Sequence, residues 1–342
     1  MIFIRATYTP IISTIRVMVL TIYAQSILYN SSNTTPNEMA LELAAKVEHV
    51  LRSQAVQSRI GITISEVVLG GSVAYGTAVQ GNYDVDLVAF SPSLHPKQGK
   101  VSEDGYSTIL AKLKIYLLEH LTGRYVPQEM EKQFHGWRFT ANYLQVDLQI
   151  SPQWEDPNLE DMYSYMRDMH PDRRILFSCG TAKYKNSLME GQPRRAKILI
   201  KRIKVWRDSV WDGKVNGCPK SFFLSILVLI SYHRAPQHLL SDATPLKTLA
   251  KWVARDIQEL VQHIRMDPNL DLHVPGENQV IMRKYSHCLP DKPRIIDPAN
   301  PFKNFYKQGL CQIEPQKSDS CEKRWDIFAR QIASLNLVMN VV

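Results

Sequence analysis

The sequence predicts an α+β protein with two lobes, the first built on a mixed sheet with helices and the second all-helical. Short apolar segments at 67–69 and 85–90 flank glycine-containing turns, and alternating segments lie within 137–150. Both patterns are typical of strands. From about Glu160 onward the strand signals fade, and apolar residues recur at helical spacing. A length of 342 residues also fits two lobes.

The composition limits the function without choosing it. The chain is 44% hydrophobic and 22% charged, as is ordinary for a globular protein. Its net charge of +8 favours a polyanionic partner, which includes nucleic acid, nucleotide and anionic membrane. The 5 cysteines are odd in number and lack C-x-x-C spacing. We therefore expect neither a disulfide framework nor a structural zinc site, and reduced thiols suit a cytoplasmic protein.

Residues 1–36 form a leader in this prediction. No Asp or Glu precedes Glu38, and an apolar run from Val17 to Tyr29 is interrupted by polar residues. A signal peptide fits the basic start, but the run is too short and too polar to span a membrane. We expect a disordered extension or a translation start further downstream, with no membrane association.

Two amphipathic helices are expected around the first strands. Apolar residues recur at helical spacing within 37–56 and again within 106–121. Such stripes usually pack against a sheet. We interpret both helices as part of the core of the first lobe.

The first strand leads into a turn that suits an anionic ligand. Residues 67–69 run into Gly70-Gly71, where the backbone can approach a ligand closely. Ser72 is a favoured N-cap, and the amides that follow an N-cap face an anion. The pattern predicts a cradle for the phosphates of a nucleoside triphosphate.

The next strand carries two carboxylates. Asp84 and Asp86 are two residues apart, so alternation places both on one face, while Val85 and Leu87 face a core. Mg²⁺ prefers oxygen ligands from a few carboxylates together with substrate phosphates. Two such ions can stabilise the attacking and leaving oxygens of an in-line displacement. The stretch therefore predicts a magnesium-dependent nucleotidyltransferase site, although a bland turn and a solvated strand face remain the alternative.

A third acid follows in the second pair of strands, which we place around a turn at 141–142. Asp147 lies between Val146 and Leu148. A buried unpaired carboxylate is costly, so Asp147 should lie on a polar face or bind a cation.

The second lobe begins with a basic helix at 193–207. Its apolar stripe faces a core, while six cations surround the stripe: Arg194, Arg195, Lys197, Lys201, Arg202 and Lys204. Such a run is usually a solvated face. The helix at 221–233 is apolar nearly all round and must be buried. Further helices are expected at 244–263 and 321–337, with a loop at 265–280.

These motifs resemble one family. The spacing from Gly70-Gly71-Ser72 through Gly76-Thr77 and Gly81 to Asp84-x-Asp86 resembles that of the 2′-5′-oligoadenylate synthases, and more distantly the cyclic GMP-AMP synthase-like enzymes. The strand around Asp147, the lysine before Trp206 and the element at 293–301 are also similar. The resemblance covers roughly residues 37–340.

The resemblance implies a polymerase beta-like nucleotidyltransferase lobe at 37–157 and an all-helical lobe at 158–342, with the active site in a cleft between them. It also implies residue roles. Three acids would bind Mg²⁺ and take part in catalysis, with Asp147 as the local base: Asp84, Asp86 and Asp147. The residues that would bind ATP are Gly71, Ser72, Lys204, Ser221 and Phe222. The residues that would bind RNA are Arg194 and Arg195. Asp297 is interpreted as a structural turn residue. Phe222 departs from the family, which places a Tyr near this position.

The function implied is that of a cytoplasmic enzyme. It would polymerise ATP, without a template, into 2′-5′-linked oligoadenylates, and double-stranded RNA would activate it in innate antiviral defence. Three alternatives stay open: a cyclic-dinucleotide synthase of the same superfamily, a catalytically silent RNA-binding member, and a poly(A) or CCA-adding polymerase.

Overall fold

The computed structural model describes residues 36–79, 83–96, 103–133, 135–155, 159–211, 215–274, 279–286, 288, 292–311 and 320–335. Nearly all of the predicted leader, Gly81 of the glycine motif and the predicted lobe boundary at 157–158 therefore lie outside the described residues. No helix in the described ranges is both long and apolar enough to cross a membrane.

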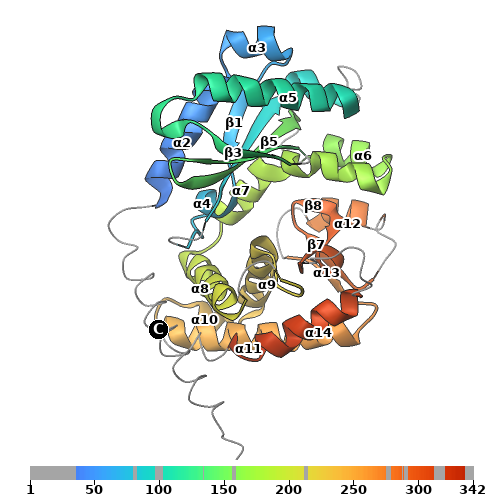
Figure 1. The fold of residues 1–342 in the computed structure, drawn as a ribbon. Coiled ribbons are helices and arrows are strands. Elements are labelled where there is room, and N and C mark those ends of the chain that lie inside the picture. The colour runs from blue at the N-terminus through green and yellow to red at the C-terminus, as the bar shows by residue number, and fades with distance from the viewer. Residues whose placement is uncertain are drawn as a thin grey trace, which may run out of the picture.

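A five-stranded mixed sheet forms the first part of the chain (Figure 1). Its order is β1-β2-β5-β4-β3. The strands are β1 (Glu66–Leu69), β2 (Val85–Ser91), β3 (Gln128–Gln133), β4 (Gly136–Ala141) and β5 (Leu144–Pro152). Strands β2 and β5 run parallel in the middle of the sheet, and the other neighbours are antiparallel. The α+β class is thereby confirmed.

Helices α2 (Pro36–Leu51), α3 (Gln54–Ile60) and α5 (Glu103–His120) accompany this sheet. Leu43 of α2 and Leu113 of α5 are buried in one hydrophobic cluster with Leu87 and Val146 of the central strands. The helix predicted at 37–56 is two helices, because Ser53 adopts an extended backbone and begins α3. Short 3₁₀ turns, η2 (Pro92–Leu94) and η4 (Gly123–Tyr125), complete the region.

The second half is mainly helical and surrounds a separate hydrophobic cluster (Figure 1). Its helices are α6 (Glu160–Arg167), η5 (Pro171–Thr181), α7 (Ala182–Glu190), α8 (Arg194–Val210), α9 (Ser221–Arg234), α10 (Gln237–Leu240), α11 (Leu246–Met266), α12 (Gln279–Ser286), α13 (Phe305–Gln308) and α14 (Cys321–Ile332). Helix α9 is buried throughout its middle, as its uniformly apolar sequence predicted.

The second half also contains a small three-stranded sheet, which the all-helical prediction did not include. It has the order β6-β7-β8, with β6 (Asp271–Leu272), β7 (Arg294–Asp297) and β8 (Asn300–Asn304). Strand β6 lies in the predicted loop at 265–280 and pairs in parallel with β7, which is distant in sequence. A strand of two residues is too short to show an alternating pattern in the sequence, so it is defined only by its pairing in the tertiary structure.

Candidate active site

Two of the predicted carboxylates meet at the centre of the mixed sheet. The parallel register of β2 and β5 places Asp86 directly opposite Asp147. Because neighbouring residues in register point to the same face, both side chains lie on one side of the sheet. Asp84 immediately precedes β2 and acts electrostatically on Asp86. The structure thus places Asp86 beside Asp147, with Asp84 near enough to affect Asp86, while a shared metal site for the three acids stays a prediction.

The glycine turn lies directly against Asp86. Gly71 has a φ of 64°, and a Cβ atom built on it would lie 1.7 Å from Oδ2 of Asp86. The amide of Gly70 donates a hydrogen bond of 2.7 Å to the carbonyl oxygen of Asp86. Only glycine fits at position 71, because it tolerates positive φ and has no side chain to collide with the carboxylate.

Ser72 is not the N-cap that the sequence predicted. The short helix α4 (Gly71–Ala74) has Gly70 as its N-cap, so Ser72 is the second helical residue. Its carbonyl oxygen accepts a hydrogen bond of 2.9 Å from the amide of Thr77. The prediction of a serine cap was wrong, because the close contact with Asp86 sets where the chain turns.

The carboxylate of Asp86 is destabilised by its surroundings, and a bound cation would stabilise it. Burial of the carboxyl group raises its pKa to about 7, and the negative charges of Asp147 and Asp84 add to the effect. The positive charges of Lys185 and Arg138 oppose it only in part. A perturbed carboxyl group among like charges is typical of functional sites.

Asp147 has a partner that the sequence analysis missed. Arg138 of β4 lies opposite Asp147 in the antiparallel register. Its Nε and one terminal nitrogen donate to the two carboxylate oxygens at 2.6 and 2.7 Å. This bidentate pair is half-buried, and the hydrogen bonds to Asp147 raise the pKa of Arg138. Both oxygens of Asp147 are therefore engaged by one guanidinium group.

The donor set fits Mg²⁺ chemically, since it consists of carboxylate oxygens. As the side chains lie, no group of three or more His, Cys, Asp or Glu residues in the described ranges is arranged to hold a metal ion. In this arrangement both oxygens of Asp147 accept hydrogen bonds from Arg138. Asp84, Asp86 and Asp147 are the residues that would hold the ion.

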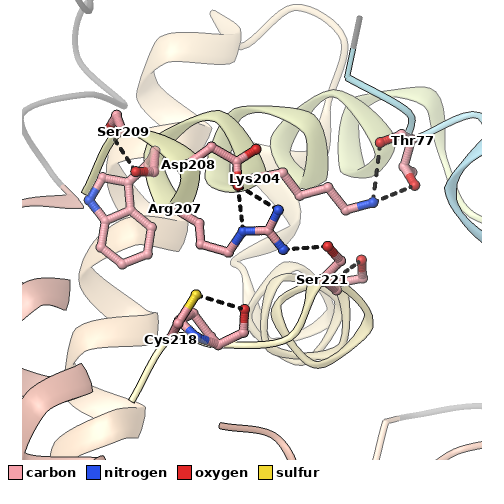
Figure 2. Close-up of polar contacts among 10 residues, drawn as sticks. Thr77, Lys204, Arg207, Asp208, Ser209, Cys218 and Ser221 are labelled. Atoms are coloured by element: carbon pink, nitrogen blue, oxygen red, sulfur yellow. Dashed lines mark hydrogen bonds and ion pairs between the residues drawn. The ribbon is translucent and has the colours of Figure 1, made fainter. Parts of the chain in front are cut away.

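Lys204 extends from α8 toward the glycine motif (Figure 2). Its side chain is buried, and Nζ donates to the carbonyl oxygen and to Oγ1 of Thr77 at 3.2 and 3.1 Å. Burial lowers the pKa of Lys204 to about 7, and Arg207 contributes to the same effect. Thr77 supplies only neutral oxygens, and the negative charges of Asp208 and Asp86 oppose the lowering of the pKa only in part. An anionic ligand would provide a counter-ion.

Ser221 and Phe222 begin α9 near the same site. One terminal nitrogen of Arg207 donates to Oγ of Ser221, and Nε of Arg207 pairs with Asp208 at 2.6 Å (Figure 2). The ring of Phe222 lies 6.0 Å from that of Tyr75, between centroids. Ser221 is thus oriented by α8, and Phe222 contacts the segment that follows the glycine turn.

Lys185 of α7 joins several parts of this region. Its Nζ lies 5.1 Å from the centre of the Phe222 ring and 3.7 Å from Oδ2 of Asp297. Asp297 is fully buried; Nζ of Lys303 approaches the same oxygen at 3.5 Å, and the amide of Ala299 donates to Oδ1 at 2.9 Å. That last bond is the turn contact predicted for Asp297.

The two arginines that were predicted to bind RNA have different surroundings in the structure. Arg194 is exposed at the start of α8. Arg195 is half-buried and donates to three backbone carbonyl groups, those of Leu240, Ser241 and Thr244. The prediction that both guanidinium groups point outward is therefore wrong for Arg195. The helical rise places Arg194 about 15 Å along the axis from Lys204.

Arg138 was missed because of a one-residue error in the turn. The chain reverses at Asn142-Tyr143, where both residues have positive φ. The predicted turn at 141–142 would have paired Asp147 with Gly136 instead of Arg138, and a one-residue shift moves every partner. Lys185 had no local signal, because only the packing of α7 brings it to Phe222.

Comparison with known proteins finds similarity to nucleotidyltransferases. Residues 53–139 match the family described as "Nucleotidyltransferase domain", a stretch that includes Asp84 and Asp86. The 2′-5′-oligoadenylate synthase 1A of Rattus norvegicus is 23% identical over 273 residues, which cover 71% of this chain and 72% of that protein. The 2′-5′-oligoadenylate synthase 3 of Mus musculus is 24% identical over 296 residues, covering 79% of this chain and 24% of that protein.

Solved structures show a similar fold. The structure of E. coli MS115-1 CdnC with ATP has a TM-score of 0.50 at 14% identity, covering 94% of this chain and 90% of that one. The CdnC:HORMA-deltaN complex gives a TM-score of 0.52 at 15% identity, covering 88% and 82%.

The matched domain and the carboxylates at the centre of its sheet define a nucleotidyltransferase. Within that class, the chain is similar in sequence to 2′-5′-oligoadenylate synthases.

Proposed function

We propose that this protein polymerises ATP into 2′-5′-linked oligoadenylates with release of pyrophosphate, and that double-stranded RNA activates it in the cytoplasm. One observation carries the chemistry: Asp86 and Asp147 lie opposite one another beside Gly71, in a site that also receives Lys204. The names of the relatives support the 2′-5′ linkage, since two synthases of that product align over most of this chain.

In this proposal, Asp84, Asp86 and Asp147 hold Mg²⁺, which when bound neutralises charge on the departing pyrophosphate and activates the acceptor hydroxyl. The chain's own residues bind and orient the donor nucleotide. Gly71 and Ser72 supply backbone amides close to the carboxylates, where the phosphates would lie. Lys204 offers a buried ammonium group whose protonated form a triphosphate would stabilise.

The base of the donor would lie against Phe222. An aromatic ring can stack on any base. The hydroxyl group of Ser221, which accepts a hydrogen bond from Arg207, can form one hydrogen bond with the base. Neither contact is selective for adenine. The expected role of Asp147 as local base requires Asp147 to leave Arg138, because both of its oxygens now accept from that guanidinium group.

RNA activation rests on the net charge of +8 and on the resemblance at Arg194 and Arg195. Arg194 would contact phosphates directly. Arg195 would act through the connection between α10 and α11 that its guanidinium group binds.

A cyclic-dinucleotide synthase is the second candidate, and the Ser221-Phe222 pair favours it, because this pair would accept guanine as well as adenine. A single assay separates the candidates. The purified chain is incubated with ATP, GTP and Mg²⁺, with and without double-stranded RNA, and products are mapped by mass and nuclease digestion. Asp86→Asn serves as the inactive control.

Linear adenylates that resist nucleases specific for 3′-5′ links, formed faster with RNA, are the expected result. Cyclic products would establish the second candidate. If no nucleotide were incorporated under any condition while RNA still bound, the chain would be a silent RNA-binding member and the proposal would fail.

A further inference from the structure

Two cysteines from distant parts of the sequence lie side by side at the start of α9. The amide of Cys311 donates to the carbonyl oxygen of Cys218 at 2.8 Å, and the amide of Gly217 donates to the carbonyl oxygen of Cys311 at 3.1 Å. The next residues continue the antiparallel pairing, with a bridge between Pro219 and Leu310. The two cysteines are therefore cross-strand partners.

The local geometry is that of a β-bulge with glycine at its first position. Gly217 has a φ of 77°, and it shares the partner Cys311 with Cys218. The bridge between Pro219 and Leu310 sets the register, in which Cys218 lies opposite Cys311. Opposite positions in an antiparallel ladder hold their Cα atoms about 4.5 to 5.5 Å apart, which lies within the range that disulfides span. The side chains of such a pair project to the same side of the ladder.

The two thiol groups also affect one another. The interaction with Cys311, followed by burial, raises the pKa of Cys218. Cys218 is buried, whereas Cys311 is half-buried, and neither is in a disulfide. A small oxidant therefore reaches Cys311 first, and Cys218 is placed to complete the bond.

We propose that Cys218 and Cys311 are a disulfide-forming pair, a site of reversible oxidation that joins the segment before α9 to the segment after α13. The oxidant is a low-molecular-weight disulfide such as oxidised glutathione. The Cys311 thiolate attacks one sulfur of this disulfide and releases one thiol. The Cys218 thiolate then attacks the Cys311 sulfur and releases the second thiol.

The balance is two protein thiols and one small disulfide converted into one protein disulfide and two small thiols. The bond would fix the first turn of α9, because Ser221 follows Cys218 by one short extended segment. It would also fix α13, whose Phe305 ring lies 6.0 Å from that of Phe222. No step depends on nucleotide or metal.

The test equilibrates the full chain with glutathione buffers of increasing oxidised fraction, without nucleotide. Alkylation under native conditions traps the products for intact-mass and peptide analysis. We expect a species that has lost two hydrogens, with a peptide linked through Cys218 and Cys311, a higher melting temperature and slower amide exchange over 217–223. Dithiothreitol should reverse all four changes.

Two variants sharpen the result. Cys311→Ser, at a half-buried position, should prevent the link and leave at most a glutathione adduct. Cys288→Ser, also half-buried, is the matched control and should form the link as the parent does. The proposal is wrong if the folded parent gives only mixed adducts, if the linked peptide contains another pair of cysteines, or if Cys311→Ser loses the same two hydrogens.

Discussion

Two acidic groups in this protein, the fully buried Asp297 and the half-buried Asp86, have opposite surroundings. Asp297 is fully buried, yet two lysines and a backbone amide surround its carboxylate. Asp86 faces two further carboxylates, and its pKa is about 7. The charge of Asp297 is compensated by neighbouring groups of the protein. The charge of Asp86 would be compensated by a bound cation.

The difference separates structural from functional charge. Burial of an ion is costly, and charged groups with strongly shifted pKa values cluster at functional sites. The same contrast holds for cations. Arg195 donates to three carbonyl groups, whereas Lys204 is buried beside neutral oxygens and its pKa falls to about 7. We therefore propose that Asp86 and Lys204 belong to the substrate site and that Asp297 and Arg195 stabilise the fold.

The largest effect is expected for Asp86→Asn. Nucleotide incorporation should fall by about a hundredfold or more, the scale of losing one electrostatic contribution in an active site. Stability without metal should rise at pH 8 by about 1 kcal/mol. The sign follows because the pKa of this acid is raised in the folded state, so the parent loses stability as pH increases from about 4 to about 7.

Incorporation is measured by radiolabel transfer, and stability by thermal melts in chelator. Asp168→Asn, which alters an exposed pair with Arg167, should change neither quantity. Normal turnover, or a lower melting temperature at pH 8, would show that Asp86 is a structural acid like Asp297.

Asp297→Asn should have the opposite outcome. It leaves Lys185 and Lys303 without their shared counter-ion, and the loss of unfolding free energy should be about 3 kcal/mol. Urea unfolding measures it. Asp326→Asn, which removes an exposed partner of Arg265, is the control and should cost less than about 1 kcal/mol. Equal losses in the two variants would remove the distinction between compensated and surface charge.

Arg138→Gln tests whether Asp147 belongs to the structural or the functional group. Without metal, the variant should lose about 2 kcal/mol, because Asp147 then faces Asp86 without its guanidinium partner. Mg²⁺ should restore most of that loss and should bind more tightly than to the parent, as measured by calorimetry. Arg124→Gln removes a surface partner of Glu42 and should leave the metal affinity unchanged. Unchanged affinity in both variants would mean that Arg138 does not compete with the ion.

Lys204→Met should raise the KM for ATP about tenfold, the scale of one lost charged hydrogen bond. Because the pKa of Lys204 is lowered on folding, the parent gains stability as pH rises from about 7 to about 10, and the variant should lack this gain. Melts across this pH range measure it. Lys197→Met on the same helix is the control. A fall in stability at pH 6 with an unchanged KM would assign Lys204 to the framework.

The smallest effect is expected for Arg194→Glu. Loss of one phosphate contact should lower the slope of RNA affinity against salt by about 1, equally for all duplex sequences. Binding is measured by fluorescence anisotropy. Arg255→Glu, another exposed arginine, is the control. An unchanged slope would make Arg194 an ordinary solvated residue, while Arg195→Ala should lower stability whether or not RNA binds.

The local patterns in the sequence determined much of this protein. Alternation identified β2, β4 and β5, helical spacing identified α5, α8, α9 and α11, and the two-residue spacing of Asp84 and Asp86 placed both acids at the candidate site. These signals are strong because each depends only on the period of an element and on burial of one face. The glycine motif was also recognised, although the close contact between Gly71 and Asp86 was not.

The tertiary structure decided the partners. The parallel register of β2 with β5 sets Asp86 against Asp147, and a turn at 142–143 sets Arg138 on Asp147. The packing of α7 brings Lys185 to Phe222, and the connection after α10 occupies Arg195. Each of these contacts joins residues whose separation along the chain carries no periodic signal. Which charges are compensated therefore depends on packing. The sequence alone identifies the charged side chains but not the groups that surround them.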